Sequence, residues 1–235
     1  MENAALILAE LISAVICFVL LKYMIIPYRF TRETRYIGLP LGFALLGASY
    51  LFMGFAYYFE SFLFVEEIKW LQLFTQAYAF VFLAVTYFFS KSSKRKNTQW
   101  NITYAALALV AVISYLIIFE PPMLELPSYK TVDEYFRLFN ILCLSYIFVY
   151  TLRSHLSKPE PKTLWIPLSY LLLAFGQYSS LIWSLESVFV ANVGAHILRI
   201  AGLLVFVFVV YQTFFGSKQA LPKEGIWDEE ASAQR

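Results

Sequence analysis

Seven apolar stretches, each about the length of a bilayer span, follow one another along this chain of 235 residues. A helix crosses the hydrocarbon core in about 20 residues, because it rises about 1.5 Å per residue through about 30 Å. The stretches cover residues 4–26, 39–59, 70–89, 102–119, 134–152, 164–183 and 193–215. They predict an all-α fold, a polytopic bundle of seven transmembrane helices over residues 1–216. A short flexible cytoplasmic tail is predicted over residues 217–235.

Positive charge alternates from rich to poor between these stretches. Fourteen of the 18 Lys and Arg residues fall around the first, third and fifth connections and in the tail. Basic segments stay in the cytoplasm, so we expect the amino terminus outside, the carboxyl terminus inside and a multi-pass protein of the plasma membrane. The basic run at residues 91–96 is explained by this orientation, so no nucleic-acid partner is expected.

The composition limits what else the chain can contain. Hydrophobic residues make up 60% and charged residues 14%, against about 25% charged in soluble domains. The seven spans use almost the whole length. We therefore expect the lipid bilayer as the main surroundings of the chain and no soluble enzymatic or DNA-binding domain.

A weak repeat links the second and third spans to the sixth and seventh. Pro40 matches Pro167 and Leu45 matches Leu172 at an offset of 127 residues, and Glu60 matches Glu186 at 126. The pattern predicts two parallel triplets of helices joined by the fourth helix, a 3+1+3 plan. Chance similarity between two amphiphilic hairpins is the alternative.

Polar side chains recur at a common depth in five of the spans. Five of them lie six residues inside the outer end of their span, roughly 9 Å deep, and two more lie one turn nearer that end. The seven residues are Glu10, Gln76, Arg137, Asn140, Gln177, His196 and Arg199. Charged groups within spans usually turn inward and pair, so Glu10 is expected to meet Arg199 or Arg137.

Three interpretations of this layer remain open. It is a structural ion pair with amide hydrogen bonds that sets the helix register, or it lines an outward-facing pocket for a small ligand or solute. The third is that the Arg side chains extend to the headgroups. In the second case Tyr50, Tyr78 and Tyr178 are candidates to line the pocket with hydroxyl groups.

Catalytic and metal chemistry find little support in the residue pattern. His155 is predicted on the cytoplasmic side, a membrane thickness from His196, which excludes a bis-His haem. A zinc site needs three or four converging ligands, and Glu10 with His196 supplies two. No Ser or Cys nucleophile has an evident His partner. We therefore expect no enzyme activity, no metal and no cofactor.

The last two spans carry a resemblance. "LSYLLLAFGQYSSLIW" at residues 168–183 and "AHILRIAGLLVFVFVVYQTFF" at residues 195–215 resemble the seven-helix membrane-input regions found in front of histidine kinases and related signalling proteins. The resemblance implies a sensor or receptor-like protein for a small ligand. No output domain follows Phe215, so the signal is expected to pass to a separate membrane or cytoplasmic partner.

Two alternative functions remain. The chain is similar in length, orientation and 3+1+3 plan to the SWEET sugar transporters, which implies a small-solute transporter or channel. In that resemblance Pro40 and Pro167 match two hinge prolines, and Gln76 and Gln177 stand in for the substrate-binding Asn residues. The other alternative is an accessory subunit of a membrane protein complex.

Overall fold

The computed structural model describes residues 2–31, 37–59, 65–90, 97–119, 128–157, 159 and 161–214. Over these residues the ordered elements are all helical, with no strand. The tail at 217–235, the basic run at 91–96 and Glu60 of the repeat lie outside the described residues.

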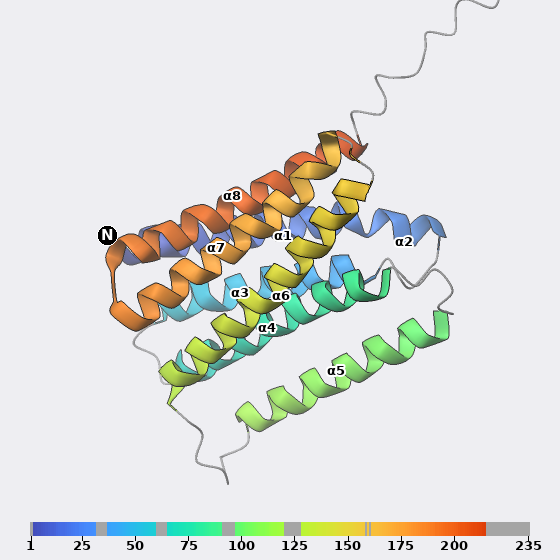
Figure 1. The fold of residues 1–235 in the computed structure, drawn as a ribbon. Helices are drawn as coiled ribbons and strands as arrows, with labels where there is room; N and C mark the ends of the chain where they lie inside the picture. Colours follow the sequence, from blue (N-terminus) through green and yellow to red (C-terminus); the bar gives the residue numbers. More distant parts are fainter. Residues whose placement is uncertain are drawn as a thin grey trace, which may run out of the picture.

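Seven long helices account for most of the described chain, and each predicted span coincides with one of them for most of its length (Figure 1). Two short elements accompany them: α2 (Ile26–Thr31) continues from the first long helix, and the 3-10 turn η2 (Pro161–Leu164) precedes the sixth. The long helices are α1 (Glu2–Met24), α3 (Gly38–Tyr58), α4 (Val65–Ser90), α5 (Asn97–Phe119), α6 (Tyr129–Ser157), α7 (Trp165–Glu186) and α8 (Phe189–Phe214).

Within the described residues, six helices are long and apolar enough to cross a membrane: all the long ones except α7. Polar residues such as Ser169, Gln177 and Ser180 lower the hydropathy of α7. That helix nevertheless packs between α6 and α8, where Figure 1 shows it running along both.

The helix ends follow from local chemistry. Pro40 and Pro167 are each the third residue of their helix, α3 and α7. A proline in the first turn costs little, because the amide hydrogen it lacks has no partner there. At the other end of α7, Ser187 adopts a left-handed φ of 54° and donates its backbone N–H to the Trp183 carbonyl at 2.8 Å. This C-cap turns the chain directly into α8.

Six of the long helices form a closed ring. Each helix packs against the next in the order α1, α3, α4, α6, α7 and α8, and α8 packs against α1 to close the ring. Helix α5 lies outside this ring against α4 (Figure 1). The Thr75 hydroxyl contacts the Tyr115 hydroxyl at 2.7 Å, and the Tyr78 hydroxyl contacts the Ser114 hydroxyl at 2.8 Å. The fourth long helix, α5, therefore stands apart from the other six.

The ring encloses a core rich in aromatic side chains. Phe206 packs edge-on against Phe43 and Tyr170, with ring centroids 5.4 and 4.7 Å away. All six ring helices contribute fully buried residues to this cluster.

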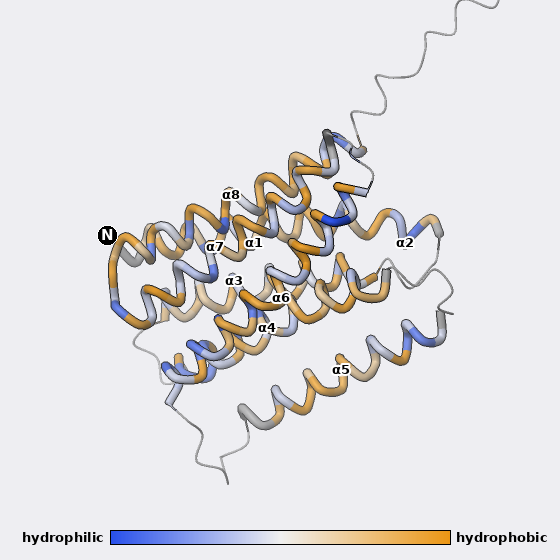
Figure 2. The backbone as a smooth tube through the Cα atoms, in the orientation of Figure 1, coloured by the Kyte–Doolittle hydropathy of each residue, from blue (hydrophilic) through white to orange (hydrophobic). Residues whose placement is uncertain are grey.

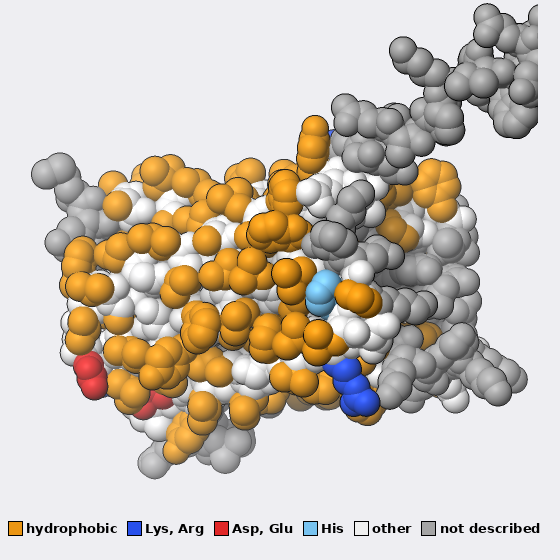
Figure 3. Space-filling view, turned by 45° about the horizontal axis from the view of Figure 1, so that its top comes forward, with side chains coloured by type: hydrophobic (Ala, Val, Ile, Leu, Met, Phe, Trp, Pro, Cys, Tyr) orange, Lys and Arg blue, Asp and Glu red, His pale blue; other side chains and the backbone are white. Residues whose placement is uncertain are grey.

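The outside of the bundle is apolar as well. Figure 2 shows hydrophobic residues along the length of every long helix, and large apolar side chains such as Leu8, Leu109 and Leu142 are more than half exposed. In Figure 3 the visible acidic side chains gather at one end of this surface and the visible Lys and Arg at the other. An apolar exterior is what a helix bundle presents to lipid.

Candidate functional site

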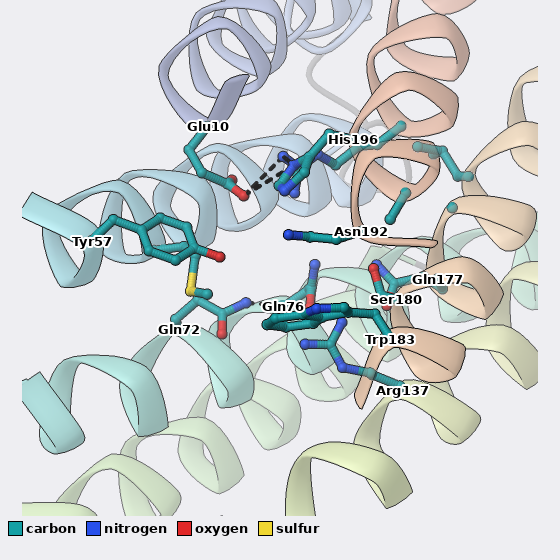
Figure 4. Close-up of a pocket in the computed structure, with 15 residues that line it drawn as sticks. Glu10, Tyr57, Gln72, Gln76, Arg137, Gln177, Ser180, Trp183, Asn192 and His196 are labelled. Atoms are coloured by element: carbon teal, nitrogen blue, oxygen red, sulfur yellow. Dashed lines mark hydrogen bonds and ion pairs between the residues drawn. The ribbon is translucent and has the colours of Figure 1, made fainter. Parts of the chain in front are cut away.

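A polar cavity of about 40 Å³ lies inside the ring, near the end where α1, α4, α6 and α8 begin (Figure 4). All six ring helices contribute to its wall, and none of the lining residues comes from α5. The lining residues are Glu10, Met53, Tyr57, Gln72, Gln76, Arg137, Leu173, Gly176, Gln177, Ser180, Trp183, Asn192, Ala195, His196 and Arg199.

One wall of the cavity is an ion pair between α1 and α8. The Arg199 guanidinium donates a hydrogen bond of 2.9 Å to Glu10 Oε1. Its carbon also lies 4.4 Å from the centre of the Tyr50 ring, a cation–π contact. Glu10 is buried, with 1% of its surface exposed. Because a buried charge is costly unless it is paired, this pair holds α1 against α8.

His196 completes this wall. Its Nδ1 lies 2.7 Å from an Arg199 nitrogen and 3.6 Å from Glu10 Oε1. A guanidinium can only donate, so Nδ1 accepts that hydrogen bond and the imidazole is neutral, with its proton on Nε2. His196 therefore orients Arg199 and does not form a second charged partner for Glu10.

A second charge pair belongs to α6. Arg137 donates from Nε to Asp133 Oδ2 at 2.6 Å, one helical turn away. The Ser184 hydroxyl of α7 donates to the same carboxylate oxygen at 3.3 Å. Each arginine of the cavity wall thus has a carboxylate partner, and these two pairs together carry no net charge.

Several buried polar atoms at the cavity have no hydrogen-bond partner among the described residues. They are Glu10 Oε2, Gln177 Oε1 and Arg199 Nε. Buried polar atoms are nearly always hydrogen-bonded, and leaving one unpaired costs about 1–3 kcal/mol. A cavity of about 40 Å³ has room for about three waters at 10–15 Å³ each. The size of the cavity and its polar wall therefore suit small polar molecules.

The wall of the cavity is partly exposed, and the cavity is closed toward the middle of the bundle. His196, Arg199 and Arg137 each keep 13% of their side-chain surface exposed. Seven residues further along α8, Phe206 and the rings packed on it fill the middle of the bundle.

The structure brings together most of the polar residues singled out in the sequence. Glu10, Gln76, Arg137, Gln177, His196 and Arg199 all line the cavity. Asn140 is fully buried in the bundle but is not among the lining residues.

The three tyrosines are placed differently from the prediction. Tyr50 lies under Arg199 and is not a lining residue. Tyr78 points to Ser114 on α5, away from the ring interior. Tyr178 has 54% of its surface exposed on the outside of α7. None of the three is among the residues that line this cavity.

The sequence analysis missed several polar lining residues. Gln72 and Asn192 each lie four residues before a predicted one, Gln76 and His196, while Ser180 lies three after Gln177. Side chains three or four residues apart share a helix face. Extending each candidate by one turn on its helix would have found these three residues.

The arrangement offers no metal site in the part of the chain that the structure describes, where no three His, Cys, Asp or Glu side chains converge. His155 lies at the other end of the bundle, with Nδ1 2.6 Å from the Thr163 hydroxyl.

Comparisons with protein-family models, with curated proteins and with solved structures find no match for the chain.

Proposed function

We propose that this chain is a seven-span receptor-like membrane protein that binds a small polar ligand in the outward-facing cavity and signals to a separate partner. The observation that carries the proposal is a set of buried polar atoms on Glu10, Gln177 and Arg199 that have no hydrogen-bond partner in the described part of the chain. They come from three helices and surround one cavity. Hydrogen-bonding atoms that the protein leaves unpaired at an accessible cavity are suited to a ligand.

The proposal places α7 across the membrane with the amino terminus outside. The closed ring supports this, because α7 packs along α6 and α8, both apolar enough to span. The end of the bundle that holds the cavity then faces outward, opposite Lys22 and Arg153, which lie near the other ends of α1 and α6.

Single cysteines on either side of α7, at the last residue of α6 and at the C-cap of α7, test this topology. After Cys17 and Cys143 are replaced by alanine, Ser187→Cys should react with a membrane-impermeant maleimide in intact cells. Ser157→Cys should react only after permeabilisation, because α7 separates the two positions. Both serines are exposed, so labelling reports the side of the membrane. Identical labelling of the two variants contradicts a spanning α7.

The Gln177→Met variant tests whether a ligand binds in the cavity. The substitution removes an unpaired buried oxygen and keeps the side-chain length, so the free energy of unfolding should not fall. A solute bound at about 100 times its Kd stabilises the fold by about 2.7 kcal/mol, and this gain should disappear in Gln177→Met. Thermal-shift screening of small polar solutes on purified protein measures both effects. Gln99→Met, at an exposed position of α5, is the matched control.

A small-solute transporter is the second candidate. It is favoured because the pattern of buried positions in one half of the ring, α1, α3 and α4, recurs in the other half, α6, α7 and α8. Each of the seven buried residues of α7 has a buried counterpart 127 positions earlier in α3, as Pro167 has Pro40. The α3 residues concerned are Pro40, Gly42, Phe43, Leu46, Gly47, Ser49 and Tyr50.

The same offset relates the remaining pairs of ring helices. Buried Asn140, Leu144 and Ile147 of α6 match buried Ser13, Cys17 and Leu20 of α1. In α8, four of the five buried residues match buried residues of α4. These are Gly202, Leu203, Phe206 and Val210, opposite Thr75, Gln76, Ala79 and Leu83. This register, together with α5 outside the ring, supports the 3+1+3 plan.

Flux assays in proteoliposomes separate the two candidates. A receptor binds its solute without carrying it inward, whereas a transporter shows uptake that Arg199→Ala or Glu10→Ala abolishes. Such uptake would replace the receptor proposal with the transporter.

A further inference from the structure

The two halves of the ring place opposite charges at equivalent positions. Glu10 on α1 and Arg137 on α6 are separated by the same 127 residues that relate buried positions of the two halves. In the order of the ring, α1 and α6 are three steps apart in either direction and therefore stand opposite each other. Figure 4 shows the two side chains on opposite sides of the cavity that both line.

Each of these charged groups has hydrogen-bonding capacity left over. Arg199 occupies Glu10 Oε1, while Oε2 has no partner among the described residues. Of the N–H donors of Arg137, only the one on Nε is bonded to Asp133, and a guanidinium carries five N–H donors. One wall thus presents a carboxylate oxygen and the opposite wall presents guanidinium amino groups, with Asn192 and Gln76 between them in Figure 4.

The charge balance restricts what binds between these walls. Glu10 and Asp133 already offset Arg199 and Arg137, so a ligand with net charge leaves one buried charge without its counterpart, which is costly. A molecule of zero net charge avoids this cost. A molecule with separated positive and negative ends also gains two charge-assisted hydrogen bonds, which are about twice as strong as neutral ones.

We infer that the ligand of this cavity is a compact zwitterion, with its carboxylate on Arg137 and its ammonium on Glu10. The inference rests on the proposed ligand-binding function and adds the chemical class. The cavity volume of about 40 Å³ corresponds to about three waters, which favours a molecule of glycine or alanine size.

Titration calorimetry on the protein in lipid nanodiscs tests this inference with four small probes: glycine, acetate, methylammonium and acetamide. Glycine should bind at least about tenfold more tightly than each of the other three, a difference of about 1.4 kcal/mol. Equal or tighter binding of acetate, methylammonium or acetamide overturns the zwitterion and leaves the proposed receptor function standing. Absence of glycine binding also overturns it, while absence of binding for every solute in a wider polar panel removes the proposed function.

Paired substitutions assign the two ends of the ligand without leaving a charge unpaired. Asp133→Asn with Arg137→Gln should weaken glycine binding at least about tenfold and leave the weak binding of methylammonium unchanged. Glu10→Gln with Arg199→Gln should weaken glycine equally and leave acetate unchanged. Arg153→Gln, at an exposed position of α6, is the control. Unchanged glycine affinity in a folded double variant contradicts the assignment, and the wild-type probe series decides the ligand class if a variant does not fold.

Discussion

Arg199→Met is expected to lower the free energy of unfolding by about 3–5 kcal/mol, because it leaves the Glu10 carboxyl group buried without a cation. Glu10 has 1% of its surface exposed, and its contact with Arg199 is 2.9 Å. His196 accepts a hydrogen bond from Arg199 and loses that donor as well. Reversible unfolding in mixed micelles measures the change.

The double variant Glu10→Leu with Arg199→Met serves as the comparison. It removes both charges, and replacing a whole buried pair by apolar groups is often close to neutral. We expect it to recover most of the stability lost in Arg199→Met. If the single and double variants are equally unstable, the loss comes from packing against Tyr50 and not from the unpaired carboxylate.

Phe206→Ala has the second large effect that we expect. Phe206 is 2% exposed and packs on Phe43 and Tyr170 in the middle of the bundle. Truncation of a buried Phe costs about 3–5 kcal/mol in soluble cores. Association of helices in lipid relies mainly on packing contacts, and these are what the truncation removes, so we expect about 3 kcal/mol. The midpoint of denaturant unfolding measures it.

Phe175→Ala is the matched control for this substitution. Its side chain is 51% exposed on the outside of α7, where truncation removes few packing contacts, so the midpoint should change little. If Phe206→Ala unfolds no more easily than Phe175→Ala, the core around Phe206 is not packed tightly enough to close the cavity toward the middle of the bundle.

Much of the fold follows from the sequence because lipid imposes a simple length rule. Each apolar stretch of about 20 residues coincides with a long helix, and Pro40 and Pro167 mark the first turns of α3 and α7. The rule works less well for α7, whose buried polar residues lower its hydropathy. A helix whose polar face meets other helices need not look apolar in sequence.

The depth of the polar residues could also be read from the sequence. Counting residues from the span ends placed Glu10 and Arg199 at one level, and the structure pairs them at 2.9 Å. Arg137, the other predicted partner of Glu10, pairs instead with Asp133 one turn away on its own helix. Depth along a helix depends only on the rise per residue, whereas the choice of partner depends on the direction each side chain faces.

The sequence by itself determined the helices, their approximate ends and the level of the polar layer, because these properties depend on distance along a single chain. Only the tertiary structure decided the closed ring with α5 outside it, the exposure of Tyr178 and the lining role of Gln72. These depend on the rotation of each helix about its axis and on which neighbours it meets. Packing between helices sets that rotation, and a one-residue shift turns a side chain by about 100° on a helix of 3.6 residues per turn.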